Sequence, residues 1–281
     1  MTHSKTCEQT LCRMPAFRPV AIQLHRLLAD EDASVFDVVS LLNSDPAFSA
    51  EVLTVANSAE LGRRYRIDTI ERAVVVLGFE RTKVIATRAA LAGMLRETQG
   101  GPVVEACWAH SRATAFLAQW LAPFFRLHPD RAYTAGLLHD VGRIGLLGVH
   151  PQEYPQLLTR VVGTNADMLA AEQLAFRTDH CEAGRWLTMA WGLPHEFSDA
   201  SSLHHNTGRI MTDPGAEAVR IACALAQALG YRAAPLIQFE SFDDIIRDVP
   251  ELTHPSSCHS MSSLVSSLEM EIPDVARTTV H

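Results

Sequence analysis

The sequence lacks both a membrane-spanning hydrophobic run and an excess of positive charge. Its longest apolar stretches, such as the one from Ala73 to Phe79, are far shorter than the roughly 20 residues that span a bilayer. The formal net charge is -8 and the pI is near 5.9, which argues against a broad electrostatic surface for nucleic acid or anionic lipid. We therefore expect neither a membrane nor a nucleic acid as partner.

Closely spaced cysteines and a secretory signal are also missing. The first 17 residues lack the apolar core that a signal peptide needs. No two cysteines form a CxxC pair, and such scattered cysteines are more typical of free thiols in a reducing compartment than of disulfides. The sequence thus predicts a cytoplasmic protein with free thiols at Cys7, Cys12, Cys107, Cys181, Cys223 and Cys258.

Strand-like alternation of apolar and polar residues is almost absent, whereas helix start signals recur. Ser34 precedes Asp37 by three residues, and Asp45 is followed by a proline, as at helix N-termini. The β-branched segment from Ala73 is ambiguous, but we interpret it as a short buried helix that ends at Gly78. The prediction is an all-α fold, with helices over 18–29, 34–43, 46–57, 69–77, 80–95, 103–122, 131–147, 152–161, 166–176, 180–191, 195–205 and 216–229.

The helices divide into two sets at the Gly- and Pro-containing break near Gly100. We expect two helical lobes, over 15–97 and 102–230, which together form one domain over 15–230. Beyond Gly230 the chain becomes rich in serine and loses clear periodicity. We expect this extension, 231–281, to be partly mobile.

Histidines and one aspartate mark the candidate site. Helical spacing places His110 on an inward-facing stripe, which taken alone is more typical of a hydrogen-bonded core residue than of a metal ligand. His139 and Asp140 lie in an apolar stretch that we interpret as helical, and a buried aspartate there needs a metal, a cation or several donors. A pair with Arg143, three residues later, would neutralise it without a metal.

Further histidines follow at His180, close to a helix start, and at His204 and His205, close to a helix end. Each has an ordinary explanation, as a capping residue or as a charge favoured at a helix C-terminus. Their joint order along the chain favours a common site instead. Neutral imidazoles with one carboxylate are suitable ligands for Fe, Mn, Zn or Ni.

This order of residues resembles the HD superfamily of metal-dependent phosphohydrolases and, within it, the HD-related output domain (HDOD) family. The resemblance covers roughly residues 15–230. It is carried by Leu42-Asn-Ser-Asp-Pro-Ala-Phe-Ser-Ala50, Val55-Ala-Asn-Ser-Ala59, Ile70-Glu-Arg-Ala-Val-Val-Val-Leu-Gly78, Trp108-Ala-His-Ser111, Gly136-Leu-Leu-His-Asp-Val-Gly142, Asp179-His180, Trp191-Gly-Leu-Pro194 and His204-His205.

The resemblance implies a two-lobed helical fold with an HD-like C-terminal lobe, and a role as an output module in bacterial signal transduction. Catalytic relatives follow their His-His doublet with a Glu and a Gly-Tyr-Pro signature, whereas here the doublet leads into Asn206-Thr-Gly-Arg209. Cys223 aligns with an aspartate ligand of active enzymes, and Arg143 aligns with a lysine. The implied metal ligands are His110, His139, Asp140, His180, His204 and His205, with Cys223 as a further candidate.

Three hypotheses remain open. The leading one is a non-catalytic module that binds signalling proteins or a small ligand such as a nucleotide. The second is a metal-dependent phosphohydrolase acting on a nucleotide or cyclic dinucleotide, with Asp140 as bridging ligand and Arg143 on a phosphate as its catalytic residues. The third is a scaffold whose histidines are only hydrogen-bonded core residues.

Overall fold

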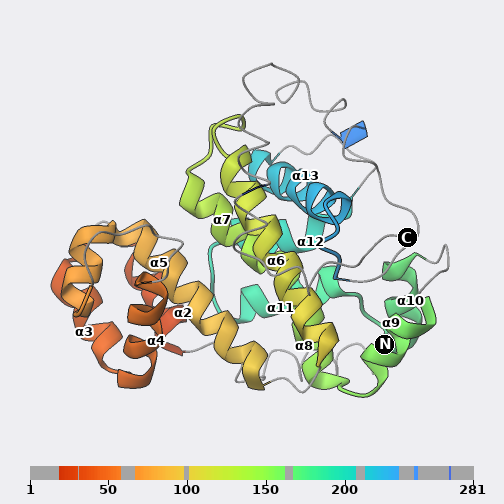
Figure 1. Ribbon diagram of the computed structural model, residues 1–281, viewed down its shortest axis with the longest axis horizontal. Helices are drawn as coiled ribbons and strands as arrows, with labels where there is room; N and C mark the ends of the chain where they lie inside the picture. Colours follow the sequence, from red (N-terminus) through yellow and green to blue (C-terminus); the bar gives the residue numbers. More distant parts are fainter. Residues whose placement is uncertain are drawn as a thin grey trace. The chain divides into compact units, whose positions relative to one another are not determined.

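The computed structural model describes residues 19–30, 32–57, 67–97, 101–161, 167–206 and 213–233, together with 244–245 and 266. These residues form helices and connecting turns, with no β-strand among them, so the predicted all-α class is confirmed (Figure 1). Within the same ranges, no helix has the length and apolar character needed to cross a bilayer. Most of the predicted extension 231–281 lies outside the described residues, and so do Cys7, Cys12, Cys258 and residues 98–100 at the predicted break.

The chain divides into two compact units. One contains 15–97 together with Met189–Pro194, and the other contains 98–188 and 195–281 together with the first 14 residues. The predicted lobe limits, 15–97 and 102–230, stay a prediction. The helices of the first unit are α2 (Pro19–Leu27), α3 (Val35–Asn43), α4 (Pro46–Ala56) and α5 (Ile70–Glu97).

Local capping explains where helices of this first unit begin and end. Ser34 Oγ accepts a hydrogen bond from the Asp37 backbone N, and Asp37 Oδ2 accepts one from the Ser34 backbone N, which together form a capping box at α3. The Asp45 carboxylate accepts from the Phe48 backbone N at 3.0 Å and starts α4. Both sequence signals are therefore confirmed.

Gly78 interrupts α5 with a φ of 74° and a ψ of 171°. This combination is open almost only to glycine, so the helix that starts at Ile70 stops there and a second helical piece follows. The predicted helix end at Gly78 is confirmed, but the predicted burial of this piece is wrong for Val75 and Val76, which are 66% and 50% exposed. The core of this unit includes the fully buried Leu24, Leu42 and Phe48.

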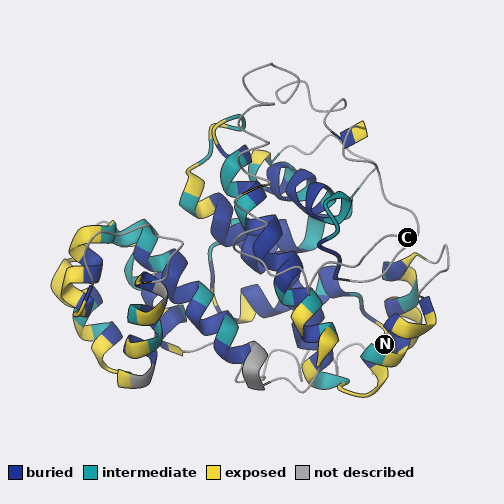
Figure 2. Ribbon diagram, viewed as in Figure 1, coloured by how far each residue is buried: buried dark blue, intermediate teal, exposed yellow. Residues whose placement is uncertain are grey.

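The second unit holds the candidate site. Its helices are α6 (Pro102–Leu121), α7 (Pro129–Leu138), α8 (Val141–Val149), α9 (Glu153–Val161), α10 (Met168–Phe176), α11 (His180–Ala190), α12 (His195–Leu203) and α13 (Pro214–Ala228). Helix α6 packs against both α7 and α13. Figure 2 shows these helices to be largely buried, as expected for central elements of the unit.

Two glycines allow backbones of this unit to approach one another closely. A Cβ atom on Gly136 of α7 would lie 2.8 Å from the Ala115 Cα of α6. A Cβ atom on Gly142 of α8 would meet the His180 carbonyl oxygen and the Gly184 backbone N of α11. Glycine at these positions therefore lets α7 and α8 bring their residues against α6 and α11.

The predicted helix over 131–147 is wrong in one respect, because it is broken at His139 and Asp140. Helix α7 ends before His139, and α8 begins after Asp140, whose φ of -103° and ψ of 16° are not helical. Both residues are almost fully buried. We attribute the break to the ion pair and imidazole contacts of these side chains, which local helix propensity does not include.

Substitution of Gly142 by alanine tests the close approach of α8 and α11. The added methyl group cannot fit against the His180 carbonyl, so we expect a loss of about 3 kcal/mol in the free energy of unfolding. Urea titrations followed by circular dichroism would measure it. The matched control is Gly215→Ala, whose Cβ would have an ordinary contact distance of 3.4 Å and should cost nothing. Equal stabilities for the two variants would contradict the packing argument.

A buried histidine makes the first unit sensitive to acid. His25 Nε2 forms a 2.7 Å hydrogen bond with Thr87 Oγ1, and the ring is 4% exposed. Burial, aided by the charge of Lys83, lowers the pKa of His25 from 6.5 to about 4. Between these two pH values the unfolded chain binds a proton that the folded chain does not.

We therefore expect the His25 contribution to stability to be complete above pH 6.5 and to fall by about 3 kcal/mol as the pH drops to 4. Urea unfolding of wild type and His25→Leu between pH 4 and pH 7 would measure this difference. Thr87→Val should lower stability yet keep the pH slope, because it retains the histidine. Parallel pH profiles for wild type and His25→Leu would refute the prediction.

Candidate metal centre

The structure brings all the sequence-predicted site residues together inside the second unit. His110 lies on α6, His139 and Asp140 lie between α7 and α8, and Arg143 lies in the first turn of α8. The remaining candidates are His180 at the start of α11, His204 and His205 just after α12, and Cys223 on α13. All but His205 are 3% exposed or less.

One side of the centre, here called the His110 side, consists of His110, His139 and Cys223. The Nε2 atoms of the two histidines lie 3.2 Å apart, and Cys223 Sγ lies 3.5 Å from His110 Nε2. The other ring nitrogens donate to backbone carbonyls: His110 Nδ1 to Tyr231 at 2.8 Å and His139 Nδ1 to Gly136 at 2.6 Å. Both imidazoles are thus fixed with their Nε2 atoms facing each other.

Burial keeps the three side chains of the His110 side uncharged. It lowers the pKa of His110 to about 4 and that of His139 well below its ordinary value. Burial also raises the pKa of the Cys223 thiol. At neutral pH the two imidazoles are therefore neutral, which is the protonation state in which histidine binds metals.

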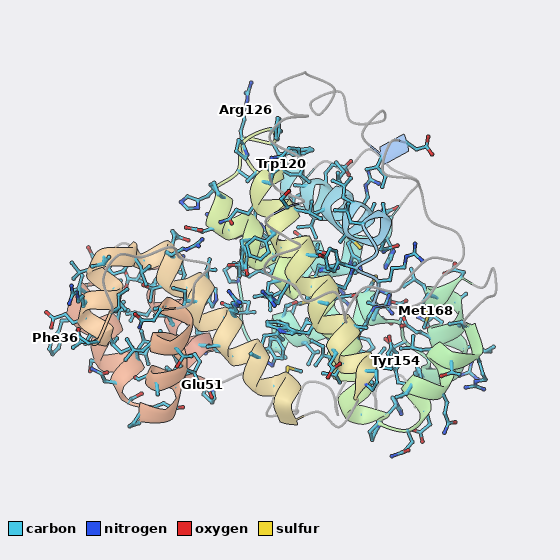
Figure 3. All side chains as sticks on the ribbon, viewed as in Figure 1. Phe36, Glu51, Trp120, Arg126, Tyr154 and Met168 are labelled. Carbon is cyan, nitrogen blue, oxygen red and sulfur yellow. The ribbon has the colours of Figure 1, made fainter. Side chains whose placement is uncertain are left out.

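The opposite side, here called the Arg143 side, is a network of Arg143, Tyr154, Glu172 and His180. Arg143 Nη1 donates to Tyr154 Oη at 3.1 Å and to Glu172 Oε1 at 3.3 Å. Tyr154, labelled in Figure 3 on α9, donates to Glu172 Oε1 at 2.6 Å. Glu172 Oε2 accepts from both the backbone N and Nδ1 of His180, at 2.9 and 2.6 Å. Arg143 Nη2 lies 3.2 Å from His180 Nε2.

Asp140 connects the two sides. Its Oδ2 accepts from Arg143 Nε at 2.8 Å and lies 3.9 Å from His110 Nε2. Although burial opposes ionisation, Arg143 and His180 hold the pKa of Asp140 well below its usual range. Its Oδ1 lies 3.4 Å from His180 Nε2 and 3.5 Å from His204 Nε2 but accepts no hydrogen bond.

His204 and His205 complete the centre. His204 Nδ1 donates to the Ser201 carbonyl at 2.9 Å, and Cys181 Sγ lies 3.9 Å from the ring nitrogens. Burial would lower the pKa of His204, but Cys181 and Asp140 outweigh it and raise that pKa to about 9. The His205 ring centroid is 4.4 Å from that of His204, and this residue is only half-buried. The His204 side chain therefore carries a positive charge at neutral pH.

Sequence reasoning missed Tyr154, Glu172 and Tyr231. Glu172 could have been found from periodicity, because it occupies the buried stripe of α10 between Met168 and Phe176. Tyr154 also lies on the buried stripe of α9, but its sequence context does not indicate that its hydroxyl group bonds to charged residues. Tyr231 lies beyond the predicted domain end at 230, and only the fold shows that its carbonyl meets His110.

The donor set on the His110 side fits a metal ion. Two neutral imidazoles present lone pairs to each other, their outer nitrogens are fixed by carbonyls, and a thiol lies beside them. Metal-binding histidines are typically oriented in this way by a hydrogen bond from the second ring nitrogen. One oxygen of Asp140 is also without a hydrogen bond. These groups could hold an ion that supplies Lewis acidity or structural cross-linking.

Glu172→Ala tests whether the Arg143 side is a charged network. Removing the carboxylate takes away the closest acidic partner of His180 and one of the two carboxylates paired with Arg143, so we expect about 3–5 kcal/mol of destabilisation. Tyr154→Phe is the graded control, because it removes one hydrogen bond and should cost about 1 kcal/mol. Urea unfolding of both variants would measure the effects. A Glu172→Ala variant that is as stable as Tyr154→Phe would rule out a charged network.

Comparison with known proteins shows which family this chain resembles. The model of the HDOD domain matches residues 14–207. A relative from Treponema pallidum (strain Nichols), named only as an uncharacterized protein, is 23% identical over 198 residues, 69% of this chain and 38% of that protein. The chain thus spans well under half the length of this relative.

Solved structures share the fold. An HDOD domain protein of unknown function from Geobacter sulfurreducens has a TM-score of 0.71 and 24% identity, covering 96% of this chain and 91% of its own. A candidate phosphohydrolase from Shewanella amazonensis SB2B has a TM-score of 0.68 and 21% identity, with coverage of 98% and 93%. A candidate signal transduction protein from Marinobacter aquaeolei VT8 has a TM-score of 0.66 and 19% identity, with coverage of 94% and 65%. Because the family match covers well over half of the sequence, the chain belongs to the HDOD domain family.

Proposed function

We propose that this protein is a non-catalytic regulatory module of a bacterial signalling pathway, which acts in the cytoplasm by binding a signalling protein or a small ligand. The observation that carries the proposal is the burial of the centre. Asp140 is 1% exposed and Arg143 is 3% exposed. A hydrolase needs its metal-activated water and its charge-stabilising groups in contact with the phosphoester, and these side chains offer no such surface.

The partners of Arg143 support the same proposal. Its Nε and Nη1 donate to Asp140, Tyr154 and Glu172, and its Nη2 lies 3.2 Å from His180 Nε2 inside the protein. A phosphate contact would require the loss of several of these charge-assisted hydrogen bonds. The name of the Marinobacter structure, a candidate signal transduction protein, agrees with a signalling role, and protein partners are accordingly our first class of ligand.

A metal-dependent phosphohydrolase is the second candidate, and one observation favours it. The neutral imidazoles of His110 and His139 and the unbonded oxygen of Asp140 are suited to a metal. The half-buried His205 is the most exposed of the candidate ligands. A nucleotide or cyclic dinucleotide would be the substrate under this alternative, and the Shewanella structure is named a candidate phosphohydrolase.

Turnover assays decide between the two. Protein loaded with Mn, Fe or Zn would be incubated with a chromogenic phosphodiester, nucleoside triphosphates and cyclic dinucleotides, and released phosphate or product would be measured. We expect rates equal to those of Asp140→Asn, because the centre is closed to substrate. Turnover that is present in the wild type and lost in a folded Asp140→Asn variant would establish the hydrolase instead.

A further inference from the structure

On the His110 side, the two imidazoles have too few N–H groups to donate to both backbone carbonyls and also to each other. A chain of four groups runs from the Tyr231 carbonyl through His110 and His139 to the Gly136 carbonyl. Carbonyl oxygens only accept, so each imidazole must donate its Nδ1 hydrogen outward. A neutral imidazole has one N–H, and both are then used. The two Nε2 lone pairs are left facing each other across 3.2 Å.

Protein hydrogens do not resolve this conflict. Cys223 has one thiol hydrogen, and its Sγ lies 3.5 Å from the Nε2 lone pair of His110, so it can fill at most one of the two lone pairs. The sulfur itself accepts from Gln227 Nε2 at 3.3 Å. A second N–H on either imidazole would create a cation inside the protein, where both rings are almost fully buried. The two facing lone pairs are therefore suited to one metal cation.

The spacing of the three ligand atoms identifies the class of that cation. In a tetrahedral zinc site with bonds of about 2.05 Å to nitrogen and about 2.3 Å to sulfur, ligand nitrogens lie about 3.3 Å apart and nitrogen and sulfur about 3.6 Å apart. The observed separations are 3.2 Å between the His110 and His139 nitrogens and 3.5 Å between His110 Nε2 and Cys223 Sγ. Thiolate ligands favour zinc and similarly thiophilic ions over Mg or Mn.

The Arg143 side has no corresponding need for an ion. The guanidinium forms ion pairs with both Asp140 and Glu172, and Glu172 is also paired with His180. Arg143 Nη2 lies 3.2 Å from His180 Nε2. A second metal bound between Asp140 and His180 would have to displace this buried cation. Asp140 thus has a candidate ion position on its His110 side and the Arg143 guanidinium on its other side.

We propose that the centre binds a single thiophilic ion of the zinc class through His110, His139 and Cys223, with Asp140 in reach, while Arg143 takes the place of a second ion. Binding forms a metal–sulfur bond, and the thiol proton leaves to solvent without any redox change. The proposal deepens the proposed function and rests on it only for the closed Arg143 side. Its test uses spectra and stoichiometry, so it succeeds or fails independently of turnover.

The experiment starts from full-length protein stripped with a chelator and dialysed against zinc or cobalt(II). We expect one zinc per chain by elemental analysis, and near-ultraviolet absorption from thiolate-to-cobalt charge transfer in the cobalt form. Cys223→Ser should lose this absorption and weaken zinc binding by more than about 10-fold, since even groups that only orient metal ligands contribute that much. Cys107→Ser, which alters another buried thiol, should keep the absorption.

Two further measurements sharpen the result. Arg143→Gln keeps a hydrogen-bonding side chain but removes the cation, and we expect its zinc content to rise from one to two per chain. Mn in equal excess should not displace zinc from the wild type. A wild type that binds no zinc or cobalt, or whose cobalt form lacks thiolate absorption, would overturn the proposal even if the Cys223→Ser variant failed to fold. Two zinc ions in the wild type would overturn the role given to Arg143.

Discussion

The centre depends on keeping one ionised carboxylate, that of Asp140, out of water. An isolated buried carboxylate is costly, and its charge must be matched by partners that are fixed in place. Arg143 supplies the main match, and Tyr154 and Glu172 fix the guanidinium in turn. The break between α7 and α8 and the close approach at Gly142 are the backbone features that allow this arrangement.

Much of the helical fold could be predicted because its signals are local. The Ser34–Asp37 capping box and the helix end at Gly78 each involve a few neighbouring residues, and both are present. The inward position of His110 follows from helical periodicity in the same way. The order of the histidines and its family resemblance then indicated residues far apart in the chain that the structure brings together.

The unpredicted features involve contacts between distant segments. Local propensity favours an unbroken helix through His139 and Asp140, but the partners of these side chains come from α6, α11 and the end of α12. Glu172 resembles an ordinary helical glutamate until its contacts with Arg143 and His180 are known. Whether the candidate ligands hold an ion is likewise a matter of their mutual distances, which no sequence pattern encodes.

The hydrogen bond from His110 to the Tyr231 carbonyl links the centre to the chain beyond α13. Gly230, with a φ of 91°, turns the backbone so that Tyr231 N bonds to Ala226 and its carbonyl meets the imidazole. A displacement of this short turn would break the hydrogen bond that fixes the His110 ring. The orientation of one candidate ligand therefore depends on the backbone at Gly230 and Tyr231, outside the helices that carry the ligands.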